Sequence, residues 1–225
     1  MTIGFKTLAV SASLLLATSL PSFADQATES YVNTNANIAL STLNDPDLDS
    51  TERREAFQTL MNRFTDMERV SRFVLGKYAN RFSDAEMDRY FDAYSRYALA
   101  TYEAQLDQYR GNAVEVTGST DRSENDSIVE TVIRRPGGDI VVKWRVLKFD
   151  GAYQVVDVAL NIDGNELWLA IEQRAQFLSI LDRNGGNADA LVSRINSMSE
   201  DLEAEARAQR TASAGRLAAG SAQEG

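Results

Sequence analysis

The chain contains no cysteine and no histidine among its 225 residues. Without cysteine there is no disulfide, no thiol nucleophile and no thiolate metal site. Without histidine the Ser-His-Asp triad and the usual zinc sites are excluded, and the commonest general base near neutral pH is missing. Any enzymatic chemistry would have to use carboxylate, lysine, tyrosine or serine–lysine groups.

Basic residues are scarce relative to acidic ones. The 23 Lys and Arg face 33 Asp and Glu, which gives a net charge of −10. This balance argues against nucleic acid as a partner, because binding needs clustered basic residues that neutralise phosphates. It also argues against permanent residence on an anionic membrane surface. We therefore expect no nucleic-acid partner and only transient membrane contact.

Long apolar runs are absent except at the N-terminus. Lys6 precedes an apolar stretch from Leu8 to Leu20, and Ser22-Phe23-Ala24 places small residues where a cleavage site needs them. The run is short for a membrane span, which needs about 20 apolar residues. We expect residues 1–24 to be a signal peptide that is cleaved after Ala24, so that the mature protein is exported to the periplasm.

Helical patterns fill the first half of the mature chain. Asp49 and Glu52 have the spacing of a capping box, and so do Ser83 and Glu86, which open the strongest helical pattern. Gly76 suits the end of a helix. The predicted helices cover residues 29–43, 50–62, 66–75 and 83–110.

Beyond Gly111 the apolar period changes to two, which indicates β-strands, and Asp150-Gly151 is a hairpin turn signal. Helical spacing then returns. The predicted strands cover 114–116, 128–134, 139–149 and 153–160, and the predicted helices cover 166–181 and 188–206. Residues 207–225 contain few apolar side chains and are predicted to be a disordered tail. Residues 25–206 would form a single domain of the α+β class, a four-stranded antiparallel sheet covered by helices from both the N- and C-terminal segments.

Two acidic patterns resemble functional sites, a calcium loop and a catalytic carboxylate. Asp45, Asp47 and Asp49 alternate like the start of a calcium loop, but Ser50 and Ala56 stand where that loop needs Gly and Glu. A polar turn with a helix cap is favoured. Asp157 lies among valines in a predicted strand, where a hydrogen-bonded structural carboxylate is favoured over a catalytic one. No catalytic residue, metal site or cofactor is assigned.

Apolar residues gather on one face of the predicted sheet, and the helix from Ser83 offers aromatic residues to cover it. Periodicity alone favours an ordinary packed core over a hollow that holds a ligand. The sheet residues are Val114, Val116, Val129, Thr131, Ile133, Ile140, Val142, Trp144 and Val146, and the helix residues are Phe91, Tyr94 and Tyr102.

Several stretches resemble the MlaC family of periplasmic phospholipid-binding proteins, also called toluene-tolerance auxiliary proteins. The first is a VLGKY element, Val74 to Tyr78, followed by a helix that carries Phe91, Tyr102, Leu106, Tyr109 and Gly111. The second runs from Tyr153 to Phe177 and matches the family at Asp157, Val158, Asp163, Gly164, Arg174 and Phe177. Tyr153 replaces the family's usual Trp, and Asn165 and Glu166 are additional residues.

The resemblance implies a non-enzymatic carrier with an apolar cavity between the sheet and the helices. Such a carrier passes phospholipid between an outer-membrane lipoprotein complex and an inner-membrane ABC transporter, which maintains outer-membrane lipid asymmetry. About 30 methylenes of a diacyl lipid would cost roughly 24 kcal/mol to expose to water, so the cavity must be apolar. The expected lipid-binding residues are Phe73, Tyr78, Phe91, Tyr94, Tyr102, Val116, Thr131, Ile133, Val142, Trp144 and Val146.

The lipid head group is expected to meet polar residues at the mouth of this cavity, with Lys77, Arg81 and Arg174 as candidates. The alternative function is that of a non-enzymatic structural or adaptor domain of the cell envelope with a filled core. A carboxylate-dependent hydrolase would require Asp157 or a similar residue for turnover, and no sequence feature supports it.

Overall fold

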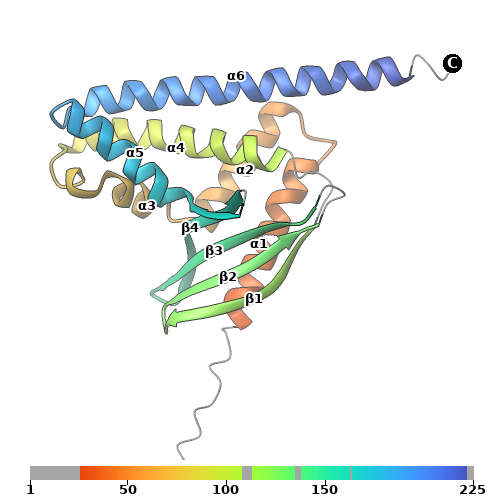
Figure 1. Cartoon of the computed structure of the whole chain (residues 1–225), viewed down its shortest axis with the longest axis horizontal. Coiled ribbons are helices and arrows are strands. Elements are labelled where there is room, and N and C mark those ends of the chain that lie inside the picture. Colours follow the sequence, from red (N-terminus) through yellow and green to blue (C-terminus); the bar gives the residue numbers. More distant parts are fainter. Residues whose placement is uncertain (1–25, 108–112, 135–137, 163, 222–225) are drawn as a thin grey trace, which may run out of the picture.

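The computed structural model describes residues 26–107, 113–134, 138–162 and 164–221 (Figure 1). The predicted signal peptide and the predicted helix end at Gly111 lie outside these residues. Four α-helices come first, with one 3₁₀ turn (Gly76–Tyr78) after the third: α1 (Gln26–Asn44), α2 (Ser50–Phe64), α3 (Met67–Leu75) and α4 (Asp84–Asp107). Five strands and two helices follow: β1 (Val114–Ser123), β2 (Asp126–Ile133), β3 (Ile140–Phe149), β4 (Ala152–Ile162), β5 (Asn165–Trp168), α5 (Leu169–Arg183) and α6 (Ala188–Ser221).

The sheet is an antiparallel meander in the order β1-β2-β3-β4-β5, which confirms the predicted α+β class. The predicted number of strands, four, was wrong. The fifth strand, β5, follows a turn at Gly164 and pairs with β4 from Ile162↔Asn165 to Ala159↔Trp168. Four residues are too short to show a period of two, so the sequence assigned most of them to the following helix.

The helices form two groups, and each has its own buried cluster (Figure 1). Helices α1 and α2 cover one face of the sheet, and α1 packs directly on β1 and β2. Helices α3, α4, α5 and α6 pack mainly on one another. We call these the sheet cluster and the helical cluster.

The sequence expects the long helix, α4, to cover the sheet with its aromatic side chains. The structure instead places Tyr90 and Tyr94 in the helical cluster, with ring centroids 6.5 and 6.3 Å from that of Phe177 in α5. Among the described side chains of α4, Leu99 is the one that joins the sheet cluster. An apolar stripe shows that a helix face is buried, but the partner of that face depends on tertiary packing.

Both capping boxes are present in the structure. The Asp49 carboxylate accepts hydrogen bonds from the backbone N–H groups of Thr51 (2.7 Å) and Glu52 (2.9 Å), and Glu52 accepts one from Asp49 N–H (3.0 Å). Glu86 likewise accepts from Ser83 N–H at 2.8 Å. The polar-turn reading of residues 45–49 is therefore the one that the structure supports. The described part of the chain holds no group of acidic side chains that could bind a metal ion.

Helix α6 continues to Ser221, into the segment for which composition predicts disorder. Ala and Arg are frequent there and rank among the strongest helix formers, which favours a helix without an apolar partner along every turn. The boundaries of the folded domain remain a prediction. None of the helices in the described part of the chain has the length and apolarity that a bilayer crossing requires.

Asp157 fixes the start of α5 to the sheet. Its carboxylate is almost fully buried and accepts hydrogen bonds from the backbone N–H groups of Val158 (2.8 Å) and Ala170 (2.9 Å). Trp168, at the N-cap of α5, makes no side-chain capping bond, so Asp157 supplies the cap from β4. Burial raises the pKa of the Asp157 carboxyl above its ordinary value, and the two backbone hydrogen bonds offset part of that rise.

We expect Asp157→Ala to lower the free energy of unfolding by about 1–3 kcal/mol, because it leaves two buried N–H groups without an acceptor. Asp157→Asn keeps an acceptor oxygen and removes the buried charge, so it should be at least as stable as the wild type at neutral pH. Urea unfolding of both variants checks this, and an Asn variant as unstable as the Ala variant would contradict it.

The difference in stability between the wild type and Asp157→Asn should also depend on pH. Because the folded-state pKa of Asp157 is raised, the unfolded chain ionises first as pH rises above 3.8. The wild type should therefore lose stability relative to Asp157→Asn as pH rises through the raised pKa, and the two should converge below pH 3.8. Urea unfolding across this pH range measures the difference.

Candidate functional site

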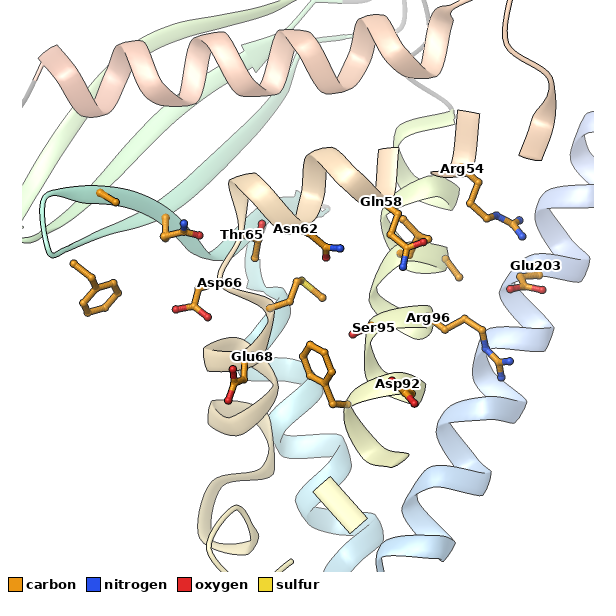
Figure 2. Close-up of a pocket in the computed structure, with 17 residues that line it drawn as sticks. Arg54, Gln58, Asn62, Thr65, Asp66, Glu68, Asp92, Ser95, Arg96 and Glu203 are labelled. Atoms are coloured by element: carbon orange, nitrogen blue, oxygen red, sulfur yellow. The ribbon is translucent and has the colours of Figure 1, made fainter. Parts of the chain in front are cut away.

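A broad polar cleft opens on the surface between α2, α3, α4 and the β3–β4 hairpin, with a volume of about 830 Å³ (Figure 2). Its walls carry side chains from six elements, α2, α3, α4, β3, β4 and α6, and from the α2–α3 connection. They are Arg54, Gln58, Asn62, Thr65, Asp66, Met67, Glu68, Phe91, Asp92, Ser95, Arg96, Leu99, Ala100, Phe149, Ala152, Gln154 and Glu203.

The charges of this cleft are mixed. Arg54 and Arg96 lie with Glu203 on the side of α2, α4 and α6, whereas Asp66 and Glu68 lie on the side of α3 (Figure 2). Arg96 donates to the Asn196 side chain at 2.8 Å. Asp92 also lies beside Arg96, so charges of both signs line the cleft, which suits a ligand that carries charges of both signs (Figure 2).

The three cations that the sequence predicts as head-group contacts lie outside the cleft. Lys77 pairs with Asp182 at 2.7 Å, the guanidinium of Arg81 lies 5.1 Å from the ring centroid of Tyr78, and Arg174 donates to the carbonyl of Phe73. None of the three lines the cleft. Arg54 and Arg96 take that position, and they carry no sequence signal because both lie on the polar sides of ordinary amphipathic helices.

A second, apolar cavity of about 60 Å³ lies inside the sheet cluster, between α1 and α2 on one side and the sheet on the other. Its lining is Ala36, Ala39, Leu40, Met61, Phe64, Thr65, Val114, Ile133, Val142, Trp144, Val155, Val158, Leu160 and Leu169. The indole N–H of Trp144 is occupied by Thr131 Oγ1 at 2.8 Å. Among these lining residues, Thr65 alone has a hydroxyl group.

Thr65 lines both the cleft and the cavity, and we call its position the junction. A third, narrow space of about 10 Å³ has Met61, Met67 and Leu99 in its wall. Met61 also lines the cavity, and Met67 and Leu99 also line the cleft. Methionine side chains adapt their shape easily, so they are suited to an entrance that must open and close.

The cavity holds roughly four to six water-sized groups, which is a fraction of one acyl chain. A longer hydrocarbon chain fits only when α1 and α2, or the side chains that line the cavity, separate further from the sheet. Ala36 and Ala39 are the residues that α1 presents there together with Leu40. Separation would expose small apolar surfaces, which a hydrocarbon chain can cover again.

Six of the predicted lipid-binding residues belong to the sheet. Ile133, Val142 and Trp144 line the cavity. Val146 is buried in the same cluster, Val116 packs against it, and the hydroxyl of Thr131 donates to Val142 carbonyl oxygen at 3.2 Å. The alternation of strand β2 and β3 residues is the signal that identified this face.

The other predicted residues belong to α3, α4 and the 3₁₀ turn. Phe91 lines the polar cleft. Tyr78 and Tyr94 are buried in the helical cluster, where their hydroxyls donate to Asp182 (2.7 Å) and Gln173 (3.0 Å). The side chain of Phe73 is 43% exposed. Tyr102 lies on α4, and its side chain is outside the described part of the structure.

The sequence missed the wall that α1 and α2 supply. Ala36 and Leu40 have helical spacing, but alanine adds little to an apolar stripe, and the larger apolar residue between them, Ile38, is 41% exposed. Met61 and Phe64 lie on the apolar side of α2. No local signal showed which surface they cover.

Comparison with known proteins decides the family. The family model described as MlaC protein matches residues 33–197, which reach from α1 into α6. The chain belongs to the MlaC family. No curated protein matches its sequence. Among solved structures, a phospholipid-binding protein from Ralstonia solanacearum in complex with a phospholipid has the same fold, with a TM-score of 0.68.

The two sequences are 21% identical, and the match covers 78% of this MlaC chain and 98% of the Ralstonia chain. At this identity the likeness establishes the fold alone. It agrees with the antiparallel sheet and helices described above.

The cavity of this MlaC-family chain predicts a difference between two alanines. Ala36→Leu on α1 places three more carbons into the empty space, so the free energy of unfolding should change by less than about 1 kcal/mol. Ala98→Leu on α4 enters the filled helical cluster and should cost about 1–3 kcal/mol. Denaturant midpoints of the two variants test this, and equal losses would show that the space beside Ala36 is not usable.

Proposed function

We propose that this protein is a periplasmic phospholipid carrier, which holds acyl chains between the sheet and α1–α2 and leaves the head group in the polar cleft. One observation carries the proposal above all. Thr65 lines both the apolar cavity and the polar surface cleft, in a chain of the MlaC family. The fold is also that of a protein that was solved with a phospholipid bound.

The energetics favour this use of the cavity. Transfer of about 30 methylenes from water into an apolar cavity is favourable by roughly 24 kcal/mol, at about 0.8 kcal/mol each. That gain can offset the separation of α1 from the sheet, which is held by few polar contacts. Asn37 pairs through its amide with both the N–H and the carbonyl of Val114 at 3.0 Å, and Glu29 accepts from the Ser119 hydroxyl at 2.6 Å.

The wider role that we propose is transfer of lipid between an outer-membrane lipoprotein complex and an inner-membrane ABC transporter, which would maintain outer-membrane asymmetry. The net charge of −10 supports this role. An acidic surface is repelled by anionic lipids, so the carrier can leave a membrane after a brief contact. Ile133, Val142 and Trp144 would contact the chains, and Phe91 would lie at the mouth.

One observation favours the other function, that of a structural or adaptor domain of the cell envelope. The cavity of about 60 Å³ is far smaller than a diacyl lipid, so a core that never opens would look much the same. The two functions differ in whether lipid accompanies the native protein.

The test is mass spectrometry of lipid extracted from protein that is purified from the periplasm without detergent. The wild type should carry close to one phospholipid per chain. Ala39→Trp fills the cavity from α1 and should lower the bound lipid at least severalfold, because the indole occupies the space of several methylenes.

Ile38→Trp is the matched control. Ile38 lies on the same helix, one residue away, with its side chain on the exposed side. This variant should keep the wild-type lipid content. A lipid-free wild type, or equal lipid content in both tryptophan variants, would exclude the carrier function.

A further inference from the structure

Thr65 has a buried hydroxyl with no hydrogen-bond partner. The residue is 3% exposed, and its Oγ1 is without a partner in the structure. An unpaired buried hydroxyl costs about 1–3 kcal/mol, so such groups are rare and usually have a use. Thr65 lines the cleft (Figure 2) and also lines the cavity.

A second unpaired polar group lies beside it. Thr65 forms an isolated parallel β-bridge with Val155, and the preceding residue, Gln154, lines the cleft. The side-chain oxygen of Gln154 is buried and also has no partner. Two side chains with an unpartnered polar atom therefore line the cleft, Thr65 from the α2–α3 connection and Gln154 from β4, next to the bridge partner of Thr65.

The backbone of Thr65 has its partners. Its N–H donates to the Met61 carbonyl at 2.8 Å, and its carbonyl accepts from Met67 N–H at 2.9 Å. The backbone is extended, with φ −121° and ψ 135°, which suits a β-branched residue. The fold therefore requires the shape of Thr65, and the hydroxyl is the part that the fold does not use.

We propose that Thr65 and Gln154 bind the ester carbonyls that join the acyl chains of a phospholipid to its glycerol. This inference rests on the carrier function proposed above and names the part of the lipid that the junction recognises. Esters lie between the apolar chains and the charged head, as Thr65 lies between the apolar cavity and the charged cleft.

Each of the two side chains has a group that can donate a hydrogen bond, although the Gln154 atom without a partner is its side-chain oxygen, which accepts. A diacyl lipid has two ester carbonyls, and each only accepts hydrogen bonds. The Thr65 hydroxyl can donate one bond, and the Gln154 amide can donate a second when its NH₂ group turns toward the junction. The phosphate would lie farther out in the cleft, on the side of Arg54 and Arg96.

The test compares two lipids with the same head group and the same chain lengths, a diester and its diether analogue, which has no ester carbonyl. Both are offered to the full-length mature protein in mixed vesicles, and the lipid taken up is counted by mass spectrometry. The wild type should prefer the diester by about tenfold, since each of two hydrogen bonds contributes a factor of about two to ten.

Thr65→Val keeps the shape and removes the hydroxyl, so the preference should fall about threefold to fivefold. Thr65→Ser restores a donor and should keep the preference. Gln154→Met should act like Thr65→Val, and the double variant should take up both lipids equally. Thr65→Val should also be at least as stable as the wild type when lipid-free, which confirms that it folds.

Equal uptake of the two lipids by the wild type would overturn this assignment and leave the carrier function standing. A preference that persists in the double variant would overturn it as well. Uptake of neither lipid would instead exclude the carrier function, and this assignment with it.

Discussion

The contact between α1–α2 and one face of the sheet is the constraint on which the site depends. It is an apolar contact in which α1 contributes small side chains, Ala36 and Ala39, opposite Val142 and Trp144. Small residues permit close approach, yet they also leave space that close packing would otherwise fill. The same interface therefore stabilises the domain and leaves an apolar cavity in it.

The two buried clusters stabilise different parts of the fold. The helical cluster is filled with tyrosine and phenylalanine rings, and Tyr90 donates to the Ser71 carbonyl at 2.9 Å from a fully buried position. Asp157 joins the start of α5 to β4 through the hydrogen bond that it accepts from Ala170 N–H at 2.9 Å. The contact of α1 with the sheet is mainly apolar, with polar contacts between Asn37 and Val114 and between Glu29 and Ser119.

Polarity changes over a short path through the site. The cleft has charges of both signs, the junction has an unpaired hydroxyl and an unpaired amide oxygen, and the cavity is lined by hydrocarbon. A phospholipid has the same sequence of groups from head to tail. This correspondence supports the proposed function more directly than the size of the cavity does.

Local sequence patterns predicted much of the fold because helix caps and strand alternation depend on neighbouring residues. The helix starts at Asp49, Asp66 and Ser83 are found where the capping residues lie, and β2 and β3 present the predicted apolar face. The fifth strand was not predicted because four residues give too short a pattern. Strand β1 continues beyond the predicted residues 114–116 to Ser123, through residues that are mostly polar and show no apolar alternation.

Local sequence patterns account for most of the helices and strands, and composition accounts for the excess of acidic charge and the absence of histidine and cysteine chemistry. Long-range packing places α1 and α2 on the sheet, the aromatic face of α4 in the helical cluster, and Thr65 beside Val155 of β4. The physical reason is that periodicity shows which face of an element is buried, whereas the partner of that face depends on contacts between residues far apart in the chain.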